Sequence, residues 1–318
     1  MRKIHCKICS KKTSSKIVIT RSKIKKKLFS CKKCDFDFFN YDPRKNLEKN
    51  KLDLSRLKKA GIKVPSIQEN FERTMYQSQF YAKKYLKLED KNKRILEIGC
   101  SHGSFLHVLK KKGFKPYGVE LNDYLRKKVQ SKLKIKCFKT TDEISNLKFS
   151  KIFLFYCIEY FIDFKKEINL IKKFLDPKGE IIIITPNKND ILKSLFLNKS
   201  YDKFFYDINS INYFSVKSLN KLMKKLNFLK YKITCKQGYG IANLFNWSIN
   251  QKPSKTGLVG EDDFMLRLFN NFKIRKVSKY ENSTIKEIKL ILSKMEKKYK
   301  KYLEKKGFGN QIILKIIK

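Results

Sequence analysis

Four cysteines near the start of the chain have the spacing of a metal site. Cys6 and Cys9 form one CxxC pair, and Cys31 and Cys34 form a second pair after 21 intervening residues. Each pair places two thiolates at the ends of one tight turn, and two such turns together supply the tetrahedral set of sulfur ligands that Zn2+ prefers. All four ligand positions are then filled, so we expect a structural zinc ion. The alternative is that the four thiols are small apolar residues of a core.

The residues between the two cysteine pairs indicate a small ribbon. Lys16–Thr20 is a run of β-branched residues and Lys23–Phe29 follows it, so both segments are expected to be strands. A unit of about 45 residues cannot bury enough apolar surface to fold alone, and a bound metal would supply the missing folding energy. We therefore expect residues 1–45 to form a zinc-ribbon module.

A glycine-containing turn further along the chain could hold a nucleotide. Gly99–Gly103 follows the apolar segment Arg94–Ile98, and Glu120 follows the next apolar segment, Lys115–Val119. Residues without bulk let the backbone pass close beneath a ligand, and a carboxylate at the end of the second strand can accept hydrogen bonds from both hydroxyls of a ribose. A glycine turn alone is equally compatible with NAD, with FAD or with no ligand.

Strands and helices alternate around this turn, which is the pattern of a parallel sheet covered on both faces. The pattern follows a helical stretch over 70–88. Further strands are predicted at 135–138, 152–157, 180–185, 229–235 and 311–317, a turn at 176–179, and helices at 104–112, 122–132 and 164–175.

Glu97–Gly103, taken together with Val119–Asn122, resembles the class I S-adenosylmethionine-dependent methyltransferases, whose first motif has an acidic residue two positions before the first glycine. Dinucleotide enzymes usually have GxGxxG without that acid. Four further segments resemble the family in the family's order, and the first of them is similar to the zinc-ribbon end of bacterial methyltransferases encoded with glycan and sugar-modification genes. These segments are Cys31–Pro43, Phe155–Tyr160, Phe174–Asn187 and Asn212–Leu219.

The resemblance implies an α/β fold with a Rossmann-like seven-stranded methyltransferase sheet, mostly parallel with the last strand antiparallel. The zinc ribbon would precede it and a helical insertion would interrupt it near the C-terminus. The expected divisions are a zinc-ribbon module at 1–45, a helical linker or cover at 46–90, the methyltransferase domain at 91–235 completed by a final strand at 307–318, and the insertion at 236–306.

The family's site roles transfer onto matching positions. The methionine and ribose parts of S-adenosylmethionine would be lined by Glu97, Gly99, Ser101 and Gly103, and Glu120 would hold the ribose hydroxyls. The remaining candidates are Leu121 against the adenine, Asp142 at the adenine amino group, and the backbone of Tyr156 and Cys157 beside the sulfonium.

The sequence departs from the family pattern in three places. Ser101 replaces the usual middle glycine, and Tyr160 and Ser210 stand where many relatives have histidine. A histidine base is therefore absent at both places. Methyl transfer needs a base only if the acceptor must lose a proton. The candidate bases are Glu159, Tyr160 and His102.

The C-terminal insertion is predicted to contain a long amphipathic helix. Thr284–Glu287 fits a capping box, and Gly307 suits the helix end. One face of this helix is apolar and is expected to lie on the catalytic domain or on a partner subunit. The residues of this face are Ile285, Ile288, Leu292, Met295, Tyr299 and Leu303. The lysine-rich outer face is interpreted as solvated, with an anionic membrane surface as the alternative.

The formal net charge of +46 by itself suggests a polyanionic partner. Only nine of the 75 basic residues are arginine, however, and lysine is spread along the whole chain. Bidentate phosphate recognition favours arginine, so dispersed solvation is the preferred interpretation. No apolar stretch is long enough to span a membrane and no signal peptide is visible, so a cytoplasmic location is expected.

The sequence is compatible with three functions. The first is methyl transfer to a small-molecule or saccharide acceptor, such as a nucleotide-linked sugar or a surface-glycan unit. The second is an RNA methyltransferase, since a zinc module next to this fold also occurs among ribosomal-RNA enzymes. The third is a catalytically inactive scaffold that binds S-adenosylmethionine, suggested by the missing histidines. The oligomeric state does not follow from the sequence.

Overall fold

The computed structural model describes residues 4–44, 67–252 and 279–318. The chain divides into two compact units. The first comprises Met1–Lys188, Lys203–Thr234 and Ile312–Lys318, and the second comprises Asn189–Asp202 and Cys235–Gln311.

A seven-stranded sheet forms the centre of the first unit. The strand order is β10-β11-β8-β7-β4-β5-β6, and the pairs β4–β5, β4–β7, β5–β6 and β7–β8 are parallel. One strand of the sheet is antiparallel, as expected for a Rossmann-like methyltransferase fold. The predicted fold class is therefore confirmed. The strand bounds are β4 Arg94–Ile98, β5 Lys115–Val119, β6 Cys137–Phe138, β7 Phe149–Phe155, β8 Leu175–Pro186, β10 Tyr231–Lys236 and β11 Gln311–Ile317.

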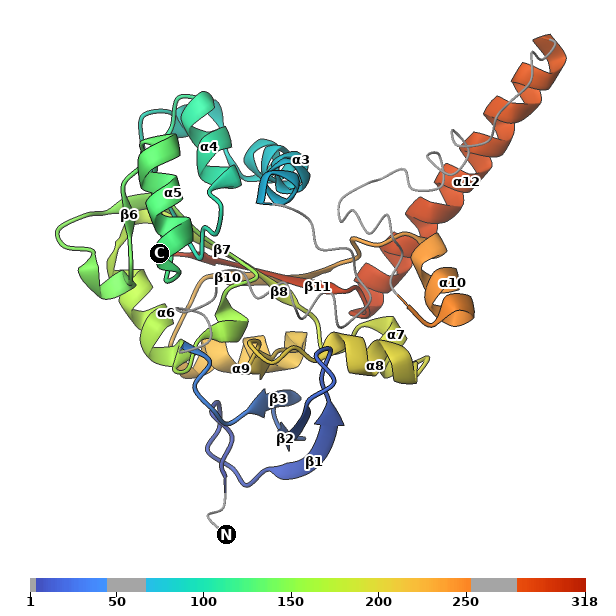
Figure 1. Ribbon diagram of the computed structural model, residues 1–318, viewed down its shortest axis with the longest axis horizontal. Helices are drawn as coiled ribbons and strands as arrows, with labels where there is room; N and C mark the ends of the chain where they lie inside the picture. The colour runs from blue at the N-terminus through green and yellow to red at the C-terminus, as the bar shows by residue number, and fades with distance from the viewer. Residues whose placement is uncertain (1–3, 45–66, 253–278) are drawn as a thin grey trace. The chain divides into compact units, whose positions relative to one another are not determined.

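Helices cover both faces of this sheet (Figure 1) because alternate strand residues point to opposite sides and both sets are apolar. Ile95 and Phe153 pack in one core cluster with residues of α3, α4 and α5, whereas Leu96 and Ile152 pack in the other with residues of α6 and α9. The helix bounds are α3 Ile67–Tyr85, α4 Ser104–Lys111, α5 Asp123–Leu133, α6 Phe164–Lys173 and α9 Val216–Lys225.

The ribbon at the N-terminus forms a second sheet in the order β1-β2-β3-β9. Three of its strands are β1 Ser14–Ile19, β2 Lys25–Cys31 and β3 Phe36–Phe39, and the fourth, β9 Asn212–Tyr213, comes from much later in the chain. Phe36 is fully buried, with its ring centroid 5.2 Å from that of Phe214 and 5.8 Å from that of Phe164. The ribbon therefore shares its core with the larger sheet.

The predicted turn at 176–179 lies inside a strand. β8 continues through it, and the pairing of β7 with β8 shifts between Phe149 and Lys151. Lys178 adopts the left-handed conformation there, with φ 61°. Pro177 and Gly179 thus mark an irregularity near the start of β8 and not a separate turn. Pro and Gly are common at the first residues and at the bulges of strands.

The second unit is mainly helical. Its main helices are α7 Ile191–Ser194, α10 Ile241–Asn250 and α12 Lys279–Lys306, and α8 Lys199–Phe205 begins in it. The predicted start of the long helix at Thr284 is wrong, because the helix begins at Lys279 and Thr284 lies within it. Its predicted end is confirmed by Gly307, whose φ is 79°.

The predicted buried face of α12 is only partly correct. Leu303 is buried, but Ile288 and Met295 are exposed. The side chains that lie buried on this helix include a charged pair, Glu296 and Lys300, whose charged atoms are 3.0 Å apart. The Oε2 atom of Glu296 also accepts a hydrogen bond from the backbone N–H of Ile241, the first residue of α10. A polar contact with α10 thus decides which side of the helix faces inward.

Candidate functional site

The turn after β4 requires glycine at two positions. Gly99 has φ 76°, and a Cβ there would lie 2.7 Å from Sγ of Cys157. Gly103 has φ 77°, and a Cβ there would lie 2.7 Å from Cδ1 of Leu133. L-residues with side chains rarely adopt this conformation, and neither position has room for a Cβ. The two glycines therefore set the path of the turn from the strand into α4.

Ser101 stands at the middle position of this turn in the left-handed conformation, with φ 50°. Its backbone N–H donates to Oε2 of Glu120 at 2.8 Å, and its Oγ lies 2.9 Å from Nδ1 of His102. These contacts offset the strain of a non-glycine residue in this region, which is on the order of 1–2 kcal/mol.

A pocket opens beside this turn. Its lining contains Glu97, Gly99, Ser101 and Tyr156, four of the nine residues predicted to contact the cofactor, and one predicted base, His102. The other lining residues are Thr74, Gln77, Ser78, Tyr81, Cys100, Ser104, Phe105 and Phe155. The pocket therefore lies at the carboxyl end of β4, where ligands bind in open parallel sheets.

Glu97 supplies a carboxyl group whose hydrogen bonds are incomplete. It is 6% exposed, and among the described residues its Oε2 atom has no hydrogen-bond partner. Burial raises the pKa of Glu97 well above its usual value, with smaller contributions from Cys137 and Glu120. A buried polar atom without a partner is costly, so this position favours a ligand that donates a hydrogen bond or carries a positive charge.

Glu120 braces the turn and is not among the residues that line the pocket. Its Oε2 accepts from Ser101 N–H and its Oε1 accepts from Asn122 N–H, both at 2.8 Å. Burial raises the pKa of Glu120, although these backbone hydrogen bonds and Arg126 oppose the rise. The backbone of Leu121 also forms a hydrogen bond with this carboxylate. A carboxylate has about four acceptor sites, so one further donor can still be bound.

The remaining predicted cofactor residues do not line the pocket. Gly103 is the N-cap residue of α4, and Leu121 is half-buried after β5. Cys157 packs its sulfur against Gly99, and Asp142 is exposed in the short 3-10 helix η2 Thr141–Glu143. The structure therefore brings Cys157 to the turn and leaves Asp142 on the surface.

Four lining residues on α3 were not predicted from the sequence. Thr74, Gln77, Ser78 and Tyr81 are spaced i, i+3, i+4 and i+7, which places them on one face of the helix. Tyr81 stacks on Phe155 at 4.5 Å between ring centroids, and its hydroxyl accepts a hydrogen bond from Nε2 of Gln77 at 2.9 Å. A polar stripe on a helix preceding the glycine turn was the available signal.

The three predicted bases lie in different surroundings. His102 lines the pocket, its Nε2 is buried without a hydrogen-bond partner among the described residues, and burial lowers its pKa. Glu159 and Tyr160 belong to the 3-10 helix η3 Ile158–Tyr160 and are not lining residues.

Glu159 is 3% exposed and its Oε2 accepts a hydrogen bond from Oγ1 of Thr185 at 3.1 Å. Burial raises the pKa of Glu159 to about 8. Tyr160 has a hydrogen bond with Ser210, and burial raises its pKa. The two positions considered for a histidine base are therefore in contact with each other.

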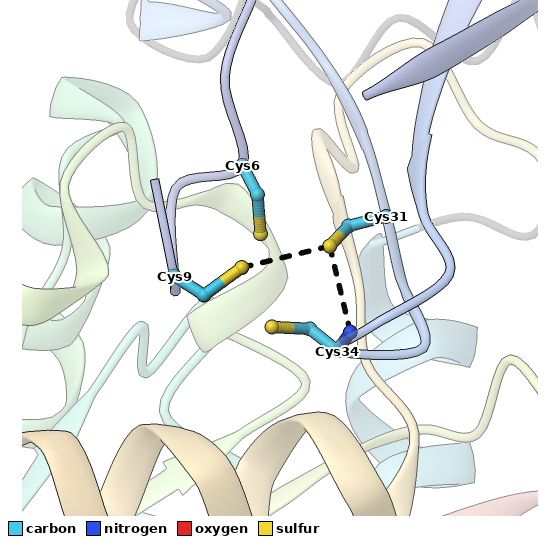
Figure 2. Close-up of side chains that lie close together, drawn as sticks. All are labelled: Cys6, Cys9, Cys31 and Cys34. Carbon is cyan, nitrogen blue, oxygen red and sulfur yellow. Dashed lines mark hydrogen bonds between the residues drawn. The ribbon is translucent and has the colours of Figure 1, made fainter. Parts of the chain in front are cut away.

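The four N-terminal cysteines converge on one point (Figure 2). Their sulfur atoms all lie within 4.8 Å of one another, and Sγ of Cys9 is 3.7 Å from Sγ of Cys31. Sγ of Cys31 also accepts from the backbone N–H of Cys34 at 3.4 Å, a contact typical of thiolate ligands in tight turns. The donor set suits a tetrahedral soft metal ion and leaves no position for a substrate.

Comparison with protein families identifies the chain. The sequence profile of a family described as a methyltransferase domain matches residues 71–232, about half of the chain. The chain belongs to this methyltransferase family. The methyltransferase has no match among curated proteins. The matched segment begins in α3 and ends in β10, so it contains the glycine turn, the pocket and η3.

Solved structures with a similar arrangement include other methyltransferases. An S-adenosylmethionine-dependent methyltransferase from Archaeoglobus fulgidus is 15% identical, with a TM-score of 0.47, over 79% of this chain and 97% of that chain. A possible histamine N-methyltransferase from Thermotoga maritima is 17% identical, with a TM-score of 0.46, over 78% and 90%. A phosphoethanolamine N-methyltransferase from Haemonchus contortus is 12% identical, with a TM-score of 0.47, over 89% and 61%.

Proposed function

We propose that this methyltransferase uses S-adenosylmethionine, bound in the pocket beside the Gly99–Gly103 turn, as its methyl donor. The observation that carries the proposal is the pocket-lining carboxyl group of Glu97, whose Oε2 has no hydrogen-bond partner within the described part of the chain. The amino group of the methionine part is a cation with three donors, which suits such a buried acceptor. The bound donor would supply a methyl group already activated by the positive sulfur.

The surrounding residues fit the rest of this ligand. Gly99 and Gly103 keep side chains away from the turn, and Glu120 retains an acceptor site for a ribose hydroxyl beside its backbone hydrogen bonds. Tyr81, Phe105 and Phe155 give the pocket an aromatic wall. In-line methyl transfer depends strongly on the orientation of donor and acceptor, and these residues would provide that orientation.

Isothermal titration calorimetry tests the donor site. Wild-type protein should bind S-adenosylmethionine and S-adenosylhomocysteine, and Glu97→Gln should weaken both affinities by roughly tenfold or more, because a charge-assisted hydrogen bond contributes about 1.5–3 kcal/mol. Glu89→Gln is the matched control, since Glu89 is exposed and distant in sequence from the turn. An unchanged affinity of Glu97→Gln for both ligands would contradict the proposed donor site.

His102 is the proposed base for an acceptor that must lose a proton. Burial lowers the pKa of His102, so the ring is neutral near pH 7 and can accept a proton, and the contact of Nδ1 with Ser101 Oγ orients it. The acceptor can be isolated because it becomes labelled when the donor carries a labelled methyl group. Measured with this acceptor, kcat of His102→Gln should be roughly a hundredfold lower than that of the wild type.

The binding of S-adenosylmethionine should change little in His102→Gln. His107→Gln is its control, because His107 lies on α4 against Phe71 and does not line the pocket. Equal loss of turnover in both variants, or none in His102→Gln, contradicts the assignment.

The N-terminal ribbon is proposed to hold Zn2+ through its four cysteines.

The proposed methyl acceptor is a small molecule or a saccharide. The resemblance of Cys31–Pro43 to glycan-modifying methyltransferases supports the saccharide. Incubation with labelled donor and fractionated cell extract, followed by mass analysis of labelled products, would identify the acceptor. Label found only in RNA would contradict this proposal and favour an RNA methyltransferase.

A further inference from the structure

The helix α12 presents an apolar stripe to solvent. Ile288, Ile291, Met295 and Tyr302 are 38%, 56%, 50% and 60% exposed. At about 3.6 residues per turn, positions i, i+3, i+7 and i+14 lie along one side of a helix, so these four side chains form a single stripe. Four large apolar side chains on one exposed line are an interaction surface rather than scattered surface residues.

The neighbouring side of α12 is already occupied within the second unit. Glu296 and Leu303 are buried there, and Oε2 of Glu296 accepts a hydrogen bond from the N–H of Ile241 at the start of α10. The inward side is thus held by a buried acidic group, while the apolar stripe faces outward. Rotation of the helix to bury the stripe would break this hydrogen bond and would expose the buried ion pair of Glu296 with Lys300.

Lysine surrounds the stripe. The helix contains ten lysines and four glutamates, and Lys294, Lys298 and Lys305 are exposed beside the stripe. The ammonium of Lys306 lies 6.0 Å from the ring centroid of Tyr302. A helix with an exposed apolar line and a cationic border can lie in the interface of an anionic bilayer, with the lysine amines reaching the headgroups.

We propose that this face of α12 docks the methyltransferase on an anionic lipid surface. The charge favours this occupant over a second copy of the chain, because two such helices side by side would bring lysine against lysine. RNA fits less well, since Tyr302 is the one aromatic ring among the four stripe residues and the other three offer no stacking surface for bases. No helix in the described part of the chain is long and apolar enough to cross a membrane, so the contact would be peripheral.

Co-sedimentation of the full-length protein with vesicles tests the proposal. The protein should bind phosphatidylcholine vesicles that contain phosphatidylglycerol roughly tenfold more tightly than vesicles of phosphatidylcholine alone. The triple substitution Ile288→Ser, Ile291→Ser and Met295→Ser should reduce binding to the anionic vesicles by roughly tenfold or more. The paired substitution Lys294→Glu and Lys298→Glu should reduce it to a similar extent and leave the apolar stripe intact.

Leu290→Ser is the matched control, because Leu290 is 54% exposed on the same helix but lies off the stripe. It should change binding by less than about twofold. Circular dichroism of each variant should match the wild type, since all of these side chains are exposed. Equal binding to both vesicle types, no binding, or full retention in the triple variant overturns the proposal. So does a wild-type dimer in light scattering that the triple variant abolishes.

Discussion

Two buried carboxyl groups near the glycine turn differ in what surrounds them. Glu97 lines the pocket with one oxygen lacking a partner among the described residues, whereas Glu159 accepts a hydrogen bond from Thr185 outside the pocket lining. The pKa of each is raised by burial. The first is therefore suited to bind a cationic ligand, and the second is suited to remain a neutral carboxylic acid inside the fold.

The raised pKa of Glu159 predicts a pH-dependent stability. Its pKa is about 8 in the folded protein against a usual value of 4.5, so its contribution to stability is fully present below pH 4.5 and is lost as the pH rises toward 8. Glu159→Gln should remove this loss. The free energy of unfolding of the variant should therefore rise relative to that of the wild type between pH 5 and 9, by on the order of a few kcal/mol.

Urea denaturation at several pH values measures this gain. Glu89→Gln, at an exposed position, serves as the control and should show no such trend. Parallel stability curves for the wild type and Glu159→Gln would show that Glu159 is ionised inside the protein.

The sequence predicted the turn and part of its surroundings. Gly99 and Gly103 were recognisable because no other residue fits their conformation. The hydrogen bond from Ser101 to Glu120 and the contact between Tyr160 and Ser210 were not recognisable, since both join residues that are far apart in the chain. Long-range side-chain contacts depend on the register of neighbouring strands, which residue types alone do not specify.

At the scale of elements, the N-terminal ribbon is joined to the larger sheet. Strand β9 completes the ribbon sheet, and Nζ of Lys188 lies 2.8 Å from Asp35 and 3.2 Å from Asp37. Phe36 lies in the same core cluster as Leu96 of β4. Loss of order in the ribbon should therefore destabilise the methyltransferase core as well.

Metal removal tests this coupling. Purified protein should contain one Zn2+ per chain by elemental analysis, and Cys31→Ser should lose the metal and lower the Tm by on the order of 10 °C. Cys235→Ser is the control, because Cys235 lies outside the cluster. A Tm that is unchanged after metal loss would show that the four cysteines do not stabilise the fold.

Elements with a strong local signal were predicted well and the others were not. The apolar runs of β4 and β11 gave their bounds correctly, since strands that are buried on both faces are nearly continuous in hydrophobicity. The start of α12 was wrong because Thr284 also fits the interior of a helix. The two-residue strand β9 carries too few distinctive residues to be found without the fold, and the polar stripe of α3 does not by itself show which element it faces.

At the scale of the whole molecule, the net charge of +46 comes almost entirely from lysine. Dispersed lysines attract any polyanion without recognising its sequence. We expect RNA to bind weakly and without sequence preference, with the affinity falling by roughly a hundredfold or more between about 50 and 200 mM salt. Fluorescence anisotropy with several unrelated RNA sequences measures both properties, and a salt-resistant preference for one sequence would contradict this view of the charge.

The central claim is that the pocket after β4 binds the methyl donor. A crystal structure with S-adenosylhomocysteine tests it most directly. We predict density for the ligand between the glycine turn and α3, with its amino group within hydrogen-bond distance of Glu97 and its ribose hydroxyls at Glu120. Density at another place, or a ligand that makes no contact with either carboxyl group, would contradict the account.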